Sequence, residues 1–463
     1  MKVKYSKRIV MIILLLPLLM GCSIADVART THIPIPVVED AEETAMQYAV
    51  PPNQPHVFVN QVGYETKSIK IVVFSGKEIS DSFEVIDAVS GETVYTGEIE
   101  PQAYDDIAGI YTKQGAFTEL DKTGTYYIQT PMIGQSYPFT IGDNLYDTLL
   151  PQMCKTMYTL REQTSKMDIS KQCIIAENLL LSYEFYPNLF SDDYGIPESG
   201  NQIPDILDEV RYEAGHLLKM QDTKTGAVLR GTKTVQTSAD YAALMANFYH
   251  FYKNYDAKFA RTCLQSGARA WQYVIGNSQE EPYTDDIYYA ATSLYRASGN
   301  EKYHAYIKKY HQQTQTQTQI KQIDANSREL YADMAYLMTR QKVDVAICRD
   351  LMSKWMDYVE TIVAKAQNSS YLSSADEVNQ ILSDMLCLSI VGHVITNHEY
   401  TTVLENHLHY FLGRNAEGVS YIDGFGSRMA DTSEMITKQP QLTSMLLFML
   451  GELNNIEMEM EES

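Results

Sequence analysis

The spacing of hydrophobic and polar residues divides the chain into a short β-rich part and a long helical part. Between residues 56 and 142, short alternating runs such as residues 69–74 and 125–128 are separated by turn-forming residues. Strands of that length at that spacing predict a small antiparallel β-sandwich. From residue 143 to residue 456, apolar residues recur at helical spacing in about a dozen segments without intervening strands. This pattern predicts an α/α toroid or a helical solenoid, and the closed toroid is favoured because no repeat of fixed period is visible.

The segment from residue 204 to residue 221 is typical of these predicted helices. Its apolar residues fall on one stripe, and its first turn carries Asp205, Asp208 and Glu209. Acidic side chains are favoured there because the N-terminal end of the helix dipole is positive. The sequence alone therefore indicates that these three acids stabilise the N-terminal end of the helix.

The first 55 residues follow neither pattern. Basic residues precede an apolar run over residues 9–20, which is shorter than a membrane span and is followed by Gly21-Cys22. This layout predicts a signal peptide over residues 1–22 whose lipobox places a lipid on Cys22, and the alternative is an ordinary signal with a chance cysteine. Residues 23–55 are polar and proline-rich, which predicts a flexible tether, and residues 457–463 are predicted to form an acidic tail. We therefore expect an exported protein, lipid-anchored to the outer face of a bacterial membrane.

Composition narrows the classes of partner. Of the 463 residues, 45% are hydrophobic, which excludes disorder throughout the chain. Lys and Arg number 37 against 59 Asp and Glu, and the resulting net charge of −22 disfavours nucleic acid as a partner because it repels phosphate. The 34 Tyr, against 13 Phe and 2 Trp, suit wet, hydrogen-bonding surfaces such as sugar sites or large interfaces. The cysteines other than Cys22 show no C-x-x-C spacing, so buried free thiols are predicted rather than a zinc site or a disulfide framework.

Several stretches resemble a known family. Asn60-Gln61-Val62-Gly63-Tyr64 is similar to the start of the immunoglobulin-like module that precedes the catalytic domain in many family 9 glycoside hydrolases, the cellulase and endoglucanase family. The run over residues 196–209 resembles that family's helix-opening signature nearly residue for residue, and residues 409–421 resemble one of its later landmarks. The resemblance implies an immunoglobulin-like β-sandwich over residues 56–142, followed by an (α/α)6 barrel over residues 143–456.

The resemblance also implies an activity, namely hydrolysis of β-1,4-glucosidic bonds with inversion in an open cleft of the barrel. One carboxylate deprotonates water and a protonated one releases the leaving oxygen. In the family, the base lies in an Asp-Ala-Gly-Asp stretch and the acid is the Glu of an Asn-Glu-Val-Ala-like stretch. This chain has neither stretch intact, and the nearest counterparts are Asp168 for the base and Glu434 for the acid.

Each of these two candidates has an alternative interpretation. Asp168 stands about one helical turn closer to Leu179 than the family pattern requires, and an Asp at this place also suits a helix N-cap. Glu434 follows only a short connection, residues 427–433, where the family has a His-rich loop whose His and Arg hold sugar hydroxyls. It is equally interpreted as a solvated carboxylate in the first turn of a helix.

Aromatic residues provide a separate indication of sugar binding, because glucan clefts present Trp or Tyr faces to pyranose rings. Both tryptophans, Trp271 and Trp355, lie on apolar helix stripes, which predicts a structural role. Tyr283, Tyr288 and Tyr371 lie near predicted helix ends and are candidates for substrate binding, and the alternative for each is packing.

Three classes of function follow from these observations. The first is a surface lipoprotein of the family 9 type, directed at β-glucan or a related polysaccharide, with hydrolysis weak or lost. The second is an active inverting endo-β-1,4-glucanase, and the third is a non-catalytic structural or interaction protein. The expected partner is a polysaccharide or oligosaccharide, membrane contact is expected only through the lipid anchor, and no cofactor is required. The resemblance allows for a structural Ca²⁺ near Asp240.

Overall fold

The computed structural model describes residues 56–76, 79–228, 234–279, 284–314, 327–394 and 397–462. The predicted signal peptide with Cys22, the predicted tether and Tyr283 lie outside the described residues. Within the described ranges, no helix combines the length and the apolar character needed to cross a membrane.

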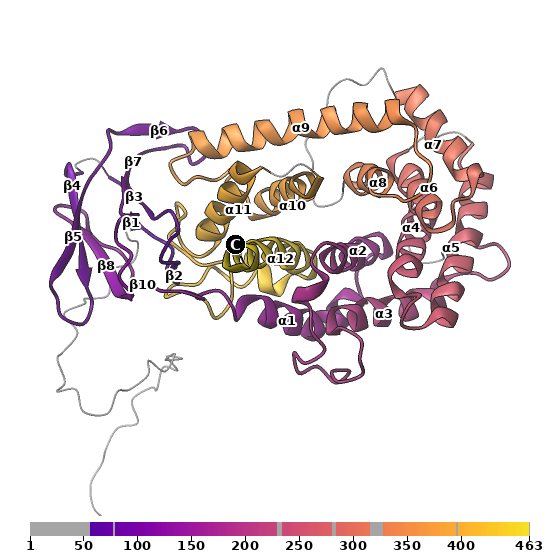
Figure 1. Ribbon diagram of the computed structural model, residues 1–463, viewed down its shortest axis with the longest axis horizontal. Coiled ribbons are helices and arrows are strands. Elements are labelled where there is room, and N and C mark those ends of the chain that lie inside the picture. The colour runs from indigo at the N-terminus through magenta and orange to yellow at the C-terminus, as the bar shows by residue number, and fades with distance from the viewer. Residues whose placement is uncertain are drawn as a thin grey trace, which may run out of the picture. The chain divides into compact units, whose positions relative to one another are not determined.

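The N-terminal part is a β-sandwich, as the alternating runs predict (Figure 1). Its strands are β1 (Val57–Phe58), β2 (Gly63–Tyr64), β3 (Ile71–Ser75), β4 (Ser82–Asp87), β5 (Thr93–Glu98), β6 (Ala103–Asp105), β7 (Ile110–Ala116), β8 (Gly124–Thr130), β9 (Gly134–Gln135) and β10 (Phe139–Ile141). One sheet has the order β1-β3-β7-β6, and the other has the order β2-β10-β8-β4-β5, with β9 paired to β8. Among these described strands, β10 and β2 pair in parallel, so the prediction of a purely antiparallel sandwich is wrong at that edge.

The C-terminal part contains twelve α-helices in its described residues (Figure 1). They are α1 (Leu149–Thr164), α2 (Ile169–Phe185), α3 (Asp205–Leu217), α4 (Thr234–Tyr252), α5 (Ala257–Asn277), α6 (Asp285–Ser298), α7 (Glu301–Thr314), α8 (Arg328–Leu337), α9 (Val345–Asn368), α10 (Val378–Val394), α11 (His398–Phe411) and α12 (Pro440–Glu462). Three short 3₁₀ segments accompany them, η1 (Pro187–Leu189), η2 (Leu218–Met220) and η3 (Ile436–Lys438). Helix α12 thus continues through most of the predicted acidic tail.

The helices form an inner and an outer ring. The helices α2, α4, α6 and α8 pack on one another in that order, α10 packs on α12, and α12 returns to α2. The odd-numbered helices lie outside them, with α5 against α4 and α7 against α6. This arrangement is the predicted (α/α)6 barrel, and the predicted two-part fold is confirmed.

Burial separates the inner helices from the outer ones. In α2, 13 of 17 residues are buried, whereas in α5 only 7 of 21 are, and these recur every three or four residues. A helix surrounded by others must be apolar nearly all round, and one at the surface needs only a single apolar stripe. The sequence pattern of each helix therefore matches its place in the barrel.

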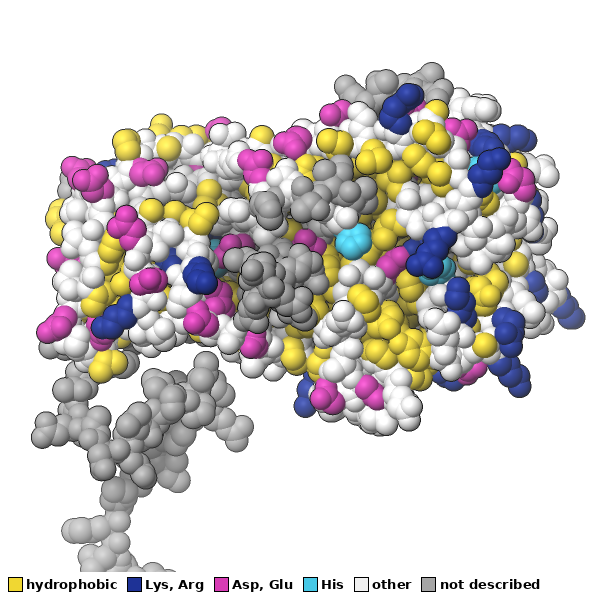
Figure 2. All heavy atoms as spheres, in the orientation of Figure 1, with side chains coloured by type: hydrophobic (Ala, Val, Ile, Leu, Met, Phe, Trp, Pro, Cys, Tyr) yellow, Lys and Arg dark blue, Asp and Glu magenta, His cyan; other side chains and the backbone are white. Residues whose placement is uncertain are grey.

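Charged side chains are unevenly distributed on the face drawn in Figure 2. Acidic residues are frequent over the sandwich, and Lys and Arg gather over the far end of the helical part, near α5 and α7 (Figures 1 and 2). The negative net charge is therefore not spread evenly over this face.

The Asn60-Gln61 segment joins the sandwich to the barrel. The Gln61 side chain donates a hydrogen bond to the carbonyl oxygen of Gly418 (2.8 Å), and its Oε1 accepts from the backbone N–H groups of Ser427 (3.0 Å) and Arg428 (2.8 Å). The Asn60 side chain lies 2.9 Å from Nδ1 of the buried His409. The sandwich thereby holds the loop that leads from α11 toward Glu434.

Candidate active site

The two candidate carboxylates lie at the same end of the barrel. Asp168 stands directly before α2, and Glu434 precedes η3 and α12. Because α2 and α12 are neighbours in the inner ring and inner-ring helices run in the same direction, both helices begin at one end of the barrel. A hydrogen bond from Gln163 Nε2 to the carbonyl oxygen of Lys438 (3.2 Å) joins the two segments. The structure thus brings the candidate base and the candidate acid to one end.

Asp168 is the N-cap of α2. Its Oδ1 accepts a hydrogen bond from the backbone N–H of Ser170 (2.9 Å), and the residue is exposed. Such a cap satisfies one of the N–H groups that the first turn of a helix leaves without a partner. The capping role, which was the alternative interpretation of this residue, is therefore present, and the catalytic role stays a prediction.

Glu434 lies in an exposed turn, and the chain just before this turn is hydrogen-bonded to the sandwich. Its backbone N–H donates a hydrogen bond to the carbonyl oxygen of Asp431 (2.8 Å). The preceding chain at Ser427 and Arg428 is held by Gln61. The carboxylate is open to solvent, and its role as a catalytic acid also stays a prediction.

The two candidate tyrosines that the structure describes are buried. The Tyr288 hydroxyl donates a hydrogen bond to Asp333 Oδ1 (2.8 Å), and its ring stacks on that of Tyr310 with centroids 4.0 Å apart. Tyr371 packs edge-on against Phe58 of the sandwich, with ring centroids 5.7 Å apart. A ring without an exposed face offers nothing for a sugar to stack on, so both tyrosines serve packing.

The tryptophans and most of the cysteines are core residues. Trp271 and Trp355 are buried, which confirms their predicted structural role, and Trp355 Nε1 donates a hydrogen bond to Asp333 Oδ2 (2.9 Å). The described cysteines are free, and all but the half-buried Cys348 are buried. The prediction of buried free thiols is therefore confirmed except at Cys348.

Asp240 is paired with an arginine and not open to a metal ion. It is fully buried on α4, and its two oxygens accept hydrogen bonds from Arg328 Nε (3.1 Å) and Nη2 (2.9 Å). Asp286 lies 3.3 Å from the same guanidinium. Burial, and next to it the negative charge of Asp240, raise the pKa of Asp286 to about 6. The guanidinium supplies the positive charge that the resemblance would assign to Ca²⁺ near Asp240.

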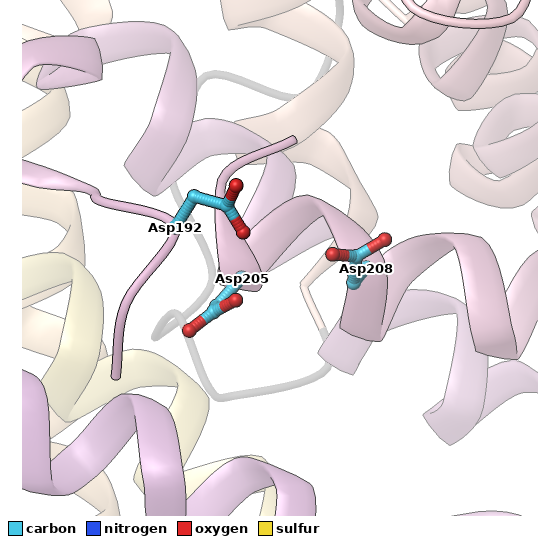
Figure 3. A group of neighbouring side chains, drawn as sticks. All are labelled: Asp192, Asp205 and Asp208. Atoms are coloured by element: carbon cyan, nitrogen blue, oxygen red, sulfur yellow. The ribbon is translucent and has the colours of Figure 1, made fainter. Parts of the chain in front are cut away.

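A different acidic cluster meets the spacing for a metal ion. Among the described residues, Asp192, Asp205 and Asp208 each offer a carboxylate oxygen within 4.8 Å of the others, and the three side chains lie near one another in Figure 3. Carboxylate oxygens are the ligands that a hard cation such as Ca²⁺ prefers. Burial raises the pKa of Asp208 to about 6, as expected of a carboxylate with acidic neighbours and no counterion.

The same carboxylates also organise the loop before α3. Asp192 accepts hydrogen bonds from the backbone N–H groups of Gly200 (2.7 Å) and Gln202 (2.5 Å), and Asp208 accepts one from Asn201 Nδ2 (3.0 Å). The sequence predicts Asp205 and Asp208 in the first turn of a helix, which is correct, but its pattern does not predict that they meet Asp192. That meeting arises only because residues 192–204 fold back on the helix.

Known proteins resemble the chain over both of its parts. The model described as "Cellulase N-terminal ig-like domain" matches residues 52–135, and the model described as "Glycosyl hydrolase family 9" matches residues 228–434. A cellodextrinase of Butyrivibrio fibrisolvens is 23% identical over 478 residues, covering 80% of this chain and 85% of that protein. An endoglucanase D of Acetivibrio thermocellus is 21% identical over 427 residues, covering 73% of this chain and 68% of that protein. A metagenome-derived glycoside hydrolase family 9 endoglucanase has the same fold, with a TM-score of 0.73, 21% identity, and coverage of 86% of this chain and 98% of its own.

Proposed function

Because the chain belongs to glycosyl hydrolase family 9 and begins its fold with a cellulase-type immunoglobulin-like domain, we propose that it is a β-glucan-binding protein of this family whose hydrolysis is weak or lost. The observation that carries the proposal is the state of the candidate base. Asp168 is an exposed N-cap that accepts a hydrogen bond from the backbone N–H of Ser170. It lies outside the residues that the family model matches. A carboxylate that caps its own helix has one oxygen already engaged by a backbone N–H, which leaves it less available to deprotonate water.

The proposed ligand is a glucan with a β-1,4-linked backbone. The relatives that cover most of the chain are named as a cellodextrinase and an endoglucanase. Sugars are uncharged, so a net charge of −22 does not oppose their binding. The short connection before Glu434 leaves fewer side chains to hold sugar hydroxyls, which supports weak binding and slow chemistry.

The alternative function is an active inverting endo-β-1,4-glucanase. One observation favours it: Asp168 and Glu434 lie at one end of the barrel, as the two carboxylates of an inverting enzyme must. This function requires that Asp168 act as base while it caps α2.

Hydrolysis and binding, measured on one preparation, distinguish these functions. We expect the full chain to release no reducing ends above background from carboxymethylated or mixed-linkage glucan, and to bind cello-oligosaccharides weakly in calorimetry. The physical reason is that an open site with few donors leaves most sugar hydroxyls to water.

The controls are single substitutions at the same end of the barrel. Asp168→Asn and Glu434→Gln remove the candidate pair, and Asp431→Asn changes a nearby exposed carboxylate to the same extent. Robust turnover that either of the first two lowers by about a hundredfold or more, with Asp431→Asn unchanged, would establish the active enzyme and contradict our proposal. If the chain shows neither hydrolysis nor binding, the result would instead favour a non-catalytic structural protein.

We also propose that the protein is exported and tethered to the outer face of a bacterial membrane through lipid on Cys22. The support is the apolar run followed by Gly21-Cys22. We expect Cys22→Ser to move the protein from the membrane fraction to the soluble fraction, because the tether would no longer carry a lipid. Detergent partitioning measures this, with replacement of the neighbouring Ser23 by Ala as the control. Equal partitioning of both variants with the unmutated protein would refute lipidation.

A further inference from the structure

Positive charge is concentrated on two outer helices, α5 and α7. Each carries three Lys or Arg residues, and Glu301 is the one acid that their sequences contain. The whole chain, by contrast, has 59 Asp and Glu against 37 Lys and Arg. On the face drawn in Figure 2, Lys and Arg gather over the end of the helical part where α5 and α7 lie. The two helices therefore carry a positive charge on a protein whose net charge is −22.

Helices α5 and α7 lie side by side, so their charges form one surface. Trp271 of α5 packs edge-on against Tyr303 of α7, with ring centroids 5.3 Å apart, and against Tyr306 of α7, also at 5.3 Å. Trp271 and Tyr303 are buried. The aromatic contact therefore lies on the apolar faces of the two helices and leaves their polar faces to solvent.

Five cations on these polar faces are exposed, and we call them the basic surface. They are Lys258, Arg261 and Arg269 on α5, and Lys302 and Lys309 on α7. Positions 258, 261 and 269 recur at helical spacing, as do positions 302 and 309, so each set lies on one face of its helix. Among the residues that the structure describes, none of the five forms an ion pair with an acid. Their charge therefore acts outward, on any molecule that approaches.

The positive potential extends to the end of α4, just before α5 begins. Burial, and next to it the charges of Arg296, Lys253 and Arg340, lower the pKa of His250 to about 4. Lys253 and Arg340 are themselves exposed. A negative net charge would favour the protonated form of a histidine, so the effect of these three cations on His250 indicates a local positive field beside the basic surface.

The predicted lipid anchor places a membrane within reach of the basic surface. Residues 23–55 would join a lipid on Cys22 to the fold, and a chain of that length spans up to roughly 110 Å when fully extended. Helix α5 has 21 residues and is about 32 Å long, so this length exceeds that of the helices themselves. The tether therefore allows either helix to meet the bilayer.

Anionic phospholipid headgroups have the charge that complements the basic surface. Each Lys or Arg close to such headgroups strengthens binding by about fivefold. At physiological salt, charges are screened beyond about 8 Å, so only the charges nearest the bilayer decide the contact. The many acids elsewhere on the chain therefore do not cancel the attraction of α5 and α7.

We propose that the basic surface docks on anionic phospholipid headgroups, so that the side of the barrel formed by α5 and α7 lies against the membrane. This inference goes beyond sugar binding and takes from the proposed export only the nearness of the membrane. Asp168 and Glu434 lie where inner helices begin, at an end of the barrel and not on this side. Docking therefore leaves that end open to a polysaccharide.

The test is cosedimentation with lipid vesicles. Residues 23–463 are used, because they keep every described residue and lack both the apolar run and Cys22. We expect this chain to bind vesicles of equal parts phosphatidylcholine and phosphatidylglycerol at low salt, and not to bind vesicles of phosphatidylcholine alone. We expect release at about 1 M salt, where the Debye length falls to about 3 Å.

Two variants with equal changes of net charge show whether the basic surface makes the contact. The surface variant should bind the anionic vesicles at least about tenfold more weakly, and its substitutions are Lys258→Gln, Arg261→Gln, Lys302→Gln and Lys309→Gln. The control variant should bind within about twofold of the unmutated chain, and its substitutions, at exposed positions outside α5 and α7, are Lys67→Gln, Lys122→Gln, Lys219→Gln and Lys224→Gln. Glutamine is nearly as good a helix former as lysine and arginine, so both variants should keep the melting temperature of the unmutated chain.

Three results would overturn the proposal. The first is that the unmutated chain does not bind anionic vesicles at low salt, and the second is that the control variant loses as much binding as the surface variant. The third is that the chain ignores vesicles but forms oligomers in sedimentation velocity that the surface variant alone dissociates, because the occupant would then be a second copy of the chain. The vesicle result does not depend on lipid at Cys22 or on glucan binding, so failure of either of those proposals would leave it standing.

Discussion

Replacing Arg328 with methionine should lower the free energy of unfolding by about 3–5 kcal/mol, because it removes the positive charge from a buried ion-pair cluster. The guanidinium donates hydrogen bonds to both oxygens of the fully buried Asp240 and lies 3.3 Å from Asp286. Methionine keeps much of the volume but leaves two carboxylates facing each other inside the barrel. Urea unfolding at pH 7 measures the loss.

Two further variants show whether the loss comes from the buried charge. Arg349→Met breaks an exposed ion pair with Asp350 and should change the free energy of unfolding by no more than about 1 kcal/mol. Adding Asp240→Asn to Arg328→Met removes one of the stranded carboxylates and should restore part of the stability. If Arg328→Met and Arg349→Met cost the same, the buried cluster does not stabilise the barrel.

The fold was predictable because each part rests on local periodicity. Alternation of apolar residues between residues 56 and 142 marks strands that have one buried face, and helical spacing after residue 143 marks helices that pack by one stripe or all round. The parallel pairing of β2 with β10 was not predictable in this way. It depends on which strands from opposite ends of the sandwich become neighbours, and periodicity within a strand carries no such information.

The candidate site was less predictable, because side-chain roles there depend on distant partners. The acids of α3 have the sequence signature of a helix N-terminus, yet Glu209 accepts a hydrogen bond from Arg161, 48 positions away. Gln61 supports Ser427 across 366 positions, and Tyr288 is buried against Asp333 on the next inner helix. Such pairs leave no local pattern.

Replacing Glu177 with glutamine should stabilise the protein at alkaline pH and leave it unchanged near pH 4.5. Glu177 lies on the inner helix α2, is 3% exposed, and accepts one hydrogen bond from Asn247 Nδ2 (2.7 Å). Burial raises its pKa from 4.5 to about 7. The folded state therefore binds more protons than the unfolded state between these values, and the stability contributed by protonated Glu177 is lost as pH rises through 7.

The size of the effect follows from that difference in pKa. The difference between pKa values of 4.5 and about 7 corresponds to about 3 kcal/mol. At pH 8 the free energy of unfolding of Glu177→Gln should therefore exceed that of the unmutated chain by up to this amount. Urea unfolding at pH 4.5 and pH 8 measures both ends of the window. Glu162→Gln on α1 is the control. Its hydrogen bond with Lys166 lowers the pKa of the exposed Glu162, which is the opposite direction to Glu177, and losing this solvent-screened pair should change the pH dependence far less. A difference between Glu177→Gln and the unmutated chain that is equal at the two pH values would show that Glu177 does not titrate inside the barrel.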